Sequence, residues 1–135
     1  MRKIDNMAET ETEMPRKPPG RVSGLGHLFA AGSYSIGGLR RLWRETAFRH
    51  ELLFSAVGIG LLVAFGASPA WVAGFVVLNL ALIAIEALNT AIECLVDHVS
   101  PDWAEFARDA KDLGSLAVAC LIAANVVCFV SALLL

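Results

Sequence analysis

The sequence predicts an all-α membrane protein in which an amphipathic surface helix precedes three membrane-spanning helices. Hydrophobic residues make up 56% of the 135 residues, charged residues make up 18%, and the mean hydropathy is +0.61. A water-soluble domain of this size does not need so much apolar surface. Nine of the eleven Lys and Arg residues precede position 52, and only Arg108 and Lys111 follow it. This segregation of charge is typical of a chain that crosses a bilayer.

The first 22 residues form a segment of different character. Residues 1–22 are polar, contain proline and carry charges of both signs. They lack the apolar run of a secretory signal peptide, so we expect a disordered extension at the start of the mature chain. Residues 23–135 are predicted to form one membrane domain. A net charge of −2 and this apolar domain argue against a nucleic-acid partner, because phosphate binding needs a basic surface.

An amphipathic surface helix is predicted over residues 25–51. Ile36, Leu39, Trp43 and Ala47 recur at helical spacing, while arginines and a glutamate occupy much of the rest. Basic residues beside an indole favour a helix that lies in the membrane interface. Three glycines in the first half of the segment predict a break there.

Three apolar segments follow, at about 52–67, 70–97 and 113–135. One span requires roughly 20 residues; the second and third segments reach this length, and the first gains it from its flanking residues. An uncharged turn joins the first two, and a polar loop, 98–112, joins the second to the third. Because Lys and Arg precede the first span and return in this loop, we expect the N-terminus inside and the C-terminus outside. The lack of charged residues in the first and third segments argues against a soluble helical bundle.

The second span carries a polar stripe formed by Glu86, Asn89, Glu93 and Asp97. Spacings of three, four and four residues place these side chains within an arc of about 80° along about 16 Å of one helix face. A carboxylate at the centre of a span costs about 2.5–3.5 kcal/mol, so such groups usually face protein, water or an ion. The emergence of the chain into the headgroups explains Asp97 equally well. It does not explain Glu86, which lies three turns deeper and favours a functional site.

Other charged residues on the expected cytoplasmic side narrow the chemistry. They are Glu45, Glu51, Arg108, Asp109, Lys111 and Asp112. Carboxylates with a lysine at a membrane surface suit Mg²⁺ and polyphosphate, because hard cations take carboxylate and phosphate oxygens. A lysine can neutralise a transferring phosphoryl group, and a buried glutamate can accept a proton from an alcohol. The pattern favours phosphoryl transfer to a membrane-embedded hydroxyl.

Two features limit this interpretation. A solvated loop with an ion pair between Arg108 and Asp112 is an equally good explanation of the charged residues that lead into the third span. The sequence also contains no GxxxxGK[ST] or GxGxxG motif and no kinase catalytic-loop pattern. Residue spacing alone therefore does not indicate ATP.

The stretch EALNTAIECLVD, residues 86–97, strongly resembles the signature of the prokaryotic diacylglycerol kinase family, and every specified position matches. The resemblance extends to YSIGGLRRLW, ETAFRHE and AKDLGSLAV and covers about residues 27–135. It implies a bacterial inner-membrane enzyme that phosphorylates diacylglycerol with MgATP to give phosphatidic acid. It also implies a homotrimer with composite sites at the cytoplasmic interface.

The resemblance further implies a role for each matching position. Glu86 corresponds to the general base, Asn89 to a residue that orients the centre, and Glu45 and Glu93 to magnesium ligands. Nucleotide contacts are implied for Tyr34, Ser35, Glu45, Glu93, Asp102, Trp103, Ala104, Lys111 and Asp112. Contacts with the lipid acceptor are implied for Ala47, Phe48, Arg49, His50, Glu51, Glu86 and Ser115.

Two other interpretations remain open at this point. An undecaprenol kinase of the same fold would carry the same signature, because the signature reports the phosphoryl-transfer site and not the lipid tail. A non-enzymatic protein would use the stripe as a proton or cation relay, or as the polar seam of an oligomer. The non-enzymatic interpretation predicts that ATP binding does not depend on Lys111 or Asp112.

Overall fold

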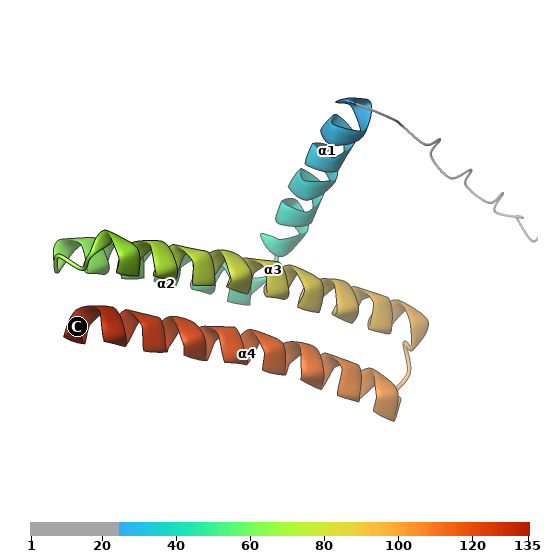
Figure 1. Cartoon of the computed structure of the whole chain (residues 1–135). Coiled ribbons are helices and arrows are strands. Elements are labelled where there is room, and N and C mark those ends of the chain that lie inside the picture. Colours follow the sequence, from blue (N-terminus) through green and yellow to red (C-terminus); the bar gives the residue numbers. More distant parts are fainter. Residues whose placement is uncertain (1–24) are drawn as a thin grey trace, which may run out of the picture.

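The computed structural model describes residues 25–135, and in this range the chain forms α-helices only. The helices are α1 (Leu25–Leu42), α2 (Thr46–Ala64), α3 (Pro69–Val99) and α4 (Glu105–Leu134). Figure 1 shows α2, α3 and α4 running side by side, with α3 antiparallel to its two neighbours, while α1 projects away from them. The predicted disordered extension, 1–22, lies outside the described residues.

Helices α2, α3 and α4 are each long and apolar enough to cross a membrane. Large apolar side chains such as Phe54, Leu88 and Leu113 are exposed on their surfaces. Exposed apolar side chains on long helices are expected where lipid, not water, surrounds the protein. The prediction of an all-α chain with three long apolar helices that could span a membrane is confirmed.

The segment predicted as one surface helix, 25–51, is divided between two helices. Helix α1 runs unbroken through Gly32, Gly37 and Gly38 and ends at Leu42, so the break lies later than the glycines suggest. A helical glycine costs only about 1 kcal/mol relative to alanine, which weakens a helix without ending it. The chain turns at Glu45, whose extended backbone (φ −77°, ψ 128°) makes it the N-cap of α2.

The turn between α2 and α3 is tight because Gly66 adopts a positive φ of 74°. Its N–H donates to the carbonyl of Val63 (3.1 Å), and the N–H of Ala67 donates to that of Leu62 (2.9 Å). This pair of bonds is a Schellman motif, in which a left-handed residue closes the end of a helix. Pro69 then begins α3 at a position that needs no backbone donor.

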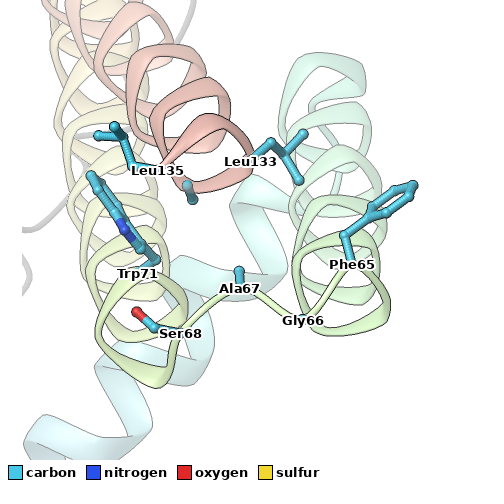
Figure 2. A pocket seen from close by; sticks show the side chains of 8 residues that line it. Phe65, Gly66, Ala67, Ser68, Trp71, Leu133 and Leu135 are labelled. Carbon is cyan, nitrogen blue, oxygen red and sulfur yellow. The ribbon is translucent and has the colours of Figure 1, made fainter.

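We call this end of the bundle the turn end, and the opposite end, with the loop 100–104 between α3 and α4, the loop end. Figure 2 shows the C-terminal residues Leu133 and Leu135 beside the turn, where they line a small pocket with Phe65 and Trp71. A core of Leu62, Phe75 and Ala132 lies near the turn end. The apolar core of the α2–α3–α4 bundle therefore lies near the turn end.

The polar segment predicted as a loop, 98–112, is mostly helical. Helix α3 continues to Val99, and α4 begins at Glu105, so the loop itself is only 100–104. An acidic residue in the first turn stabilises a helix through its interaction with the helix dipole, and Glu105 occupies that place. The first two turns of α4 consequently carry Arg108, Lys111 and Asp112 on an ordered helix beside α3.

Candidate active site

The predicted polar stripe lies along one face of α3 and becomes more exposed toward the loop end. Glu86 is 6% exposed and Asn89 is 9% exposed. Glu93 is half-buried and Asp97 is exposed. Burying a charged side chain is costly unless other groups compensate it. Glu86 and Asn89 therefore form the buried part of the site, and Asp97 forms its solvent-exposed edge.

Four carboxylates gather where the start of α2 meets α3. Glu86 interacts electrostatically with Glu45, Glu51 and Glu93. We call these four side chains the carboxylate cluster. Glu45 and Glu51 lie on either side of the first turn of α2, because the chain leaves α1 at that point and enters the bundle. The cluster thus combines residues separated by more than thirty positions in the sequence.

Asn89 lies beside the cluster and its amide is held in one orientation. Its Nδ2 donates a hydrogen bond to Glu93 Oε1 at 3.1 Å. Its Oδ1 is buried and has no hydrogen-bond partner among residues 25–135. That oxygen points at Gly114 of α4, where a Cβ atom would overlap it. The absence of a side chain at position 114 gives the amide its space.

Two cations border the carboxylates. Lys111 Nζ is 2.5 Å from Asp97 Oδ1 and also interacts electrostatically with Glu93. Arg41, at the end of α1, pairs with Glu45 and approaches Cys94 Sγ at 3.5 Å. The hydrogen bond with Glu45 raises the pKa of Arg41, so its guanidinium stays charged. The site therefore has positive charge on two sides, one from α1 and one from α4.

The donor set of the cluster fits a hard divalent cation that also binds phosphate. No group of three or more His, Cys, Asp or Glu side chains within residues 25–135 is arranged to hold a metal by itself. Mg²⁺ is usually held by one or two carboxylates together with substrate phosphates and water. Glu45 and Glu93 provide two such carboxylates beside Glu86. Their oxygen chemistry matches Mg²⁺ better than a soft metal.

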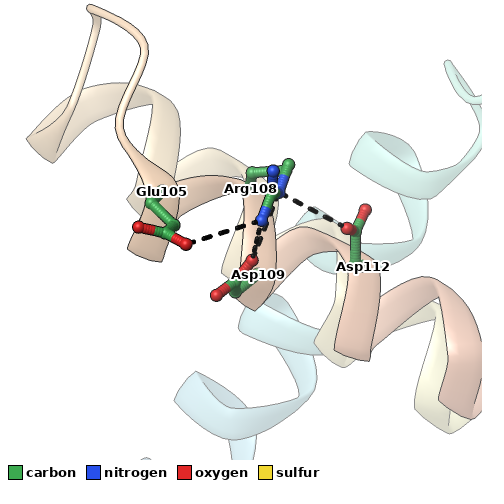
Figure 3. Close-up of polar contacts among 4 residues, drawn as sticks. All are labelled: Glu105, Arg108, Asp109 and Asp112. Carbon is green, nitrogen blue, oxygen red and sulfur yellow. Dashed lines mark hydrogen bonds and ion pairs between the residues drawn. The ribbon is translucent and has the colours of Figure 1, made fainter.

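Asp112 is part of a separate ion-pair group on the outer surface of α4. Arg108 lies 2.8 Å from Asp109, 3.9 Å from Asp112 and 4.0 Å from Glu105. Figure 3 shows its side chain among these three carboxylates. The ion pair of Arg108 with Asp112 that the sequence allowed as an alternative is present. All four side chains are exposed, and exposed pairs of this kind contribute little to stability.

The other predicted nucleotide residues lie on two further segments. Tyr34 and Ser35 are on the exposed part of α1. Asp102, Trp103 and Ala104 form the end of the loop between α3 and α4. Trp103 is 78% exposed, which leaves its indole free of the helix core. These residues and Lys111 are distributed over α1, the loop and α4.

The predicted lipid-contacting residues divide into three environments. Ala47, His50 and Glu51 line a groove between α2, α3 and α4 whose other walls are mainly apolar. Phe48 is only 1% exposed and belongs to the core, where its ring meets that of Trp43 edge-on at 6.3 Å. Two residues remain on the surface: Arg49, which donates to Thr46 Oγ1 at 3.2 Å, and Ser115.

The groove connects the surface of the bundle with the carboxylate cluster. It runs along α2 from Ala47 to Leu61 and has a volume of about 600 Å³. Glu51 lines the groove and interacts electrostatically with Glu86. Glu51 Oε2 is buried without a hydrogen-bond partner in the described residues. A molecule in this groove would therefore lie beside Glu51 Oε2, a hydrogen-bond acceptor, and Glu51 in turn lies next to Glu86.

A second polar layer, which is not among the residues predicted from the sequence, lies deeper in the same groove. The hydroxyl of Ser55 bonds with Asn79 Oδ1, and Asn79 Nδ2 donates to the carbonyl of Phe75 at 2.7 Å. Asn125 of α4 also lines the groove and is buried. The signal was available, because Asn79 precedes Glu86 by seven residues and so lies on the same face of α3.

Together, these features define a protein with three helices that could span a membrane and with a buried carboxylate site where the start of α2 meets the middle of α3. The family model of prokaryotic diacylglycerol kinase matches residues 33–133. A diacylglycerol kinase of a Sinorhizobium species is 48% identical over 108 residues, which cover 80% of this chain and 79% of that protein. Diacylglycerol kinases of Haemophilus influenzae and Escherichia coli K12 are 34% and 33% identical, and the matches cover 73% and 72% of this chain and 84% and 80% of theirs.

The chain belongs to the prokaryotic diacylglycerol kinase family, a family of lipid kinases. The family suggested by the sequence signature is thereby confirmed. A kinase family implies a nucleotide and usually a metal ion, which agrees with the oxygen-rich character of the carboxylate cluster.

Proposed function

We propose that this protein transfers the γ-phosphoryl group of ATP to the free hydroxyl of diacylglycerol and releases phosphatidic acid and ADP. The observation that carries the proposal is the buried carboxylate of Glu86, which interacts electrostatically with Glu51 at the edge of a groove with mainly apolar walls. The names of the relatives supply the acceptor, and the groove supports it because its walls are mainly apolar. A lipid chain in the groove would bring its polar end to Glu51.

The transfer needs a base that removes the proton of the lipid hydroxyl, and it replaces one P–O bond of ATP by another. Glu86 takes the proton of the lipid hydroxyl, whose oxygen attacks the γ-phosphorus while the bond to the β,γ-bridging oxygen breaks. Asn89 fixes the position of Glu93 by donating to its Oε1. Lys111, which already interacts electrostatically with Glu93, offsets negative charge on the phosphoryl group. Asn89, Glu93 and Lys111 lie where α3 and α4 face each other, and Glu86 lies farther along α3 beside Glu51 of α2.

Magnesium and nucleotide are assigned to the loop end of the bundle. Glu45 and Glu93 would hold Mg²⁺, which neutralises phosphate charge when bound. The nucleotide would contact Lys111 together with Tyr34, Ser35, Asp102, Trp103, Ala104 and Asp112. The lipid acceptor would border Ala47, Phe48, Arg49, His50, Glu51 and Ser115. Because Phe48 is buried, we assign it to the support of this border.

The proposal also includes placement in the cell and assembly. Eight basic residues precede α2, a ninth, Arg49, lies in its first turn, and Arg108 and Lys111 lie near the loop end, which favours a cytoplasmic loop end. We place the protein in the bacterial inner membrane because the family is prokaryotic. We propose that α1 is an amphipathic helix that lies at the membrane surface. We also propose that the active assembly is a homotrimer. Large exposed apolar faces on α2 and α4 leave room for contacts between copies.

The decisive experiment is reconstitution of the full chain into vesicles with MgATP and one acceptor at a time. We expect transfer of ³²P to diacylglycerol. Transfer to undecaprenol alone would keep the kinase chemistry and replace the acceptor, while labelling of neither lipid would overturn the proposed function. ATP-independent movement of protons across the vesicle membrane would instead support a relay.

A pair of variants tests the role of Glu86 in the same assay. Glu86→Gln keeps the size of the side chain and removes the base, so we expect kcat to fall about 10²- to 10⁴-fold. Glu105→Gln is the matched control, because Glu105 is exposed at the start of α4 and pairs only weakly with Arg108 at 4.0 Å. Wild-type turnover by Glu86→Gln would remove Glu86 as the base.

A further inference from the structure

Gly114 of α4 packs directly against Asn89 in the polar stripe of α3. The residue is buried, and a Cβ atom at this position would overlap Asn89 Oδ1 and lie 3.2 Å from Asn89 Cγ. The overlap with Oδ1 is closer than real Cβ atoms come to other atoms, so one of the two groups would have to move. Gly32, Gly37, Gly38, Gly60, Gly66 and Gly74 meet nothing within 4 Å.

The atom that Gly114 accommodates belongs to a residue with little freedom to move. Asn89 is 9% exposed, and its Nδ2 is committed to Glu93 at 3.1 Å. Rotation of the amide away from an added methyl group would break this hydrogen bond. The Oδ1 atom has no hydrogen bond among the described residues that would hold the amide in place. The packing of Asn89 against position 114 therefore takes part in fixing the amide.

Gly114 also stands three residues after Lys111 on α4. These two residues lie on neighbouring turns of one helix, so the separation of α3 and α4 at Gly114 affects the reach of Lys111 toward α3. Lys111 Nζ now lies 2.5 Å from Asp97 Oδ1. A methyl group at position 114 is therefore expected to disturb either the amide of Asn89 or the spacing that brings Lys111 to the site.

We propose that Gly114 is a positioning residue for phosphoryl transfer, because its missing side chain fixes the Asn89 amide against Glu93. The inference rests on the proposed function and adds a residue to it. Gly114 touches no reacting atom and acts through Asn89. The proposal requires that any side chain at position 114 costs activity only while the asparagine side chain is present.

A double-mutant cycle with Gly114→Ala and Asn89→Ala tests this dependence. Displacement of a catalytic group by about 1 Å can cost on the order of 100-fold in rate, and we expect a loss of that order in kcat for Gly114→Ala. Asn89→Ala removes the atoms that an added methyl would strike. In that background Gly114→Ala should change kcat by less than about twofold, because coupled residues are not additive.

Two glycine variants serve as controls for the change itself. Gly74→Ala adds a methyl to α3 in open space and should keep wild-type kcat. Gly58→Ala adds a methyl that strikes the ring of Phe75 at 2.9 Å, away from the carboxylate cluster. It reports the effect of crowding between helices without contact to Asn89. Kinetic constants of all variants are measured in the same vesicles.

Thermal unfolding supplies a readout that does not need activity. Gly114→Ala should lower the unfolding temperature of the wild-type chain, and the same change should have no such effect in Asn89→Ala. If Gly114→Ala does not fold, recovery of folded protein by adding Asn89→Ala supports the contact, and failure to recover it overturns the proposal. Multiplicative losses of kcat, or wild-type kcat in Gly114→Ala, would also overturn it. Absence of kinase activity in the wild type would overturn the proposed function, and the unfolding cycle would still decide the contact.

Discussion

Two glycines mark close approaches of the long helices, and they face different chemistry. Gly58 of α2 meets the rings of Phe75 and Phe129 near the turn end, while Gly114 of α4 meets the amide of Asn89 near the loop end. An aromatic ring in an apolar core can shift and still lie against apolar atoms. An amide that holds a carboxylate cannot shift without losing its hydrogen bond. Equal crowding is therefore expected to affect stability at one end and chemistry at the other.

The largest effect that would sharpen this comparison is expected from Lys111. Lys111→Gln removes the positive charge beside Glu93, and loss of one charge-stabilising group costs on the order of 100-fold in kcat. Asp97→Asn removes its ion-pair partner and should cost much less, because exposed pairs are worth about 0–1 kcal/mol. Steady-state kinetics in vesicles distinguish the two. Equal losses in both variants would show that Lys111 serves only the ion pair.

Phe75 is expected to give the largest effect on stability. Phe75→Ala leaves a cavity in the core with Leu62 and Ala132 and removes the ring contact with Phe129 at 5.9 Å. Lipid solvates apolar groups as well as the core does, so the cavity accounts for most of the cost, on the order of 1–3 kcal/mol. Unfolding in mixed micelles measures this loss. Phe75 also lines the groove proposed for the lipid acceptor, so a change in KM for diacylglycerol is compatible with the comparison. A fall in kcat per folded molecule at saturating lipid would contradict it.

Gly58→Ala should have a smaller effect of the same kind. Overpacking a helix contact costs about 1–3 kcal/mol, and replacing a helical glycine by alanine returns about 0.5–1 kcal/mol. We expect a modest loss of stability, measured by unfolding. Gly58 also lines the groove proposed for the lipid acceptor, so KM for diacylglycerol and kcat are measured on the same preparation, and any kinetic change is expected in KM. Gly60→Ala on the same helix, which meets nothing within 4 Å, is the control and should be at least as stable as wild type.

The smallest effects are expected from the polar layer between the two ends. Asn79→Leu removes the partner of Ser55 and should cost about 0.6 kcal/mol, the typical value for a hydrogen bond between membrane helices. Asn125→Leu should be neutral or stabilising, because it removes a buried oxygen without a partner in the described chain. Unfolding measurements compare the two. Loss of kcat with Asn125→Leu would assign this layer to the lipid site.

The sequence predicts the three long helices and the polar stripe because both depend on local patterns. Apolar runs of sufficient length indicate spans, and the spacing of Glu86, Asn89 and Glu93 places them on one face. The approach of Glu45 and Glu51 to Glu86 depends on where the chain leaves α1. The extended backbone of Glu45 sets that point. The sequence does not reveal it, because the helical spacing of apolar residues continues without interruption past Glu45.

The role of Gly114 lies beyond sequence reasoning for a similar reason. A glycine in a span indicates close packing of some kind, but the atom that it meets belongs to another helix. Its opposition to Asn89 follows from how α3 and α4 are aligned along their length. The layer of Ser55, Asn79 and Asn125 also needs three helices, although single amides in apolar spans are a usable signal.

The Schellman turn at Gly66 has a consequence for the reach of the site across the membrane. Because the turn is so short, α2 cannot slide along α3, and the level at which Glu51 meets Glu86 is set from the far end of the bundle. Fifteen residues separate Glu51 from Gly66, a distance of about 22 Å at the helical rise. One residue inserted into α2 between them would raise Glu51 by about 1.5 Å and rotate it by about 100° away from its partner. The turn at Gly66 therefore fixes the height and the rotation of Glu51 relative to Glu86, although it lies about 22 Å from Glu51.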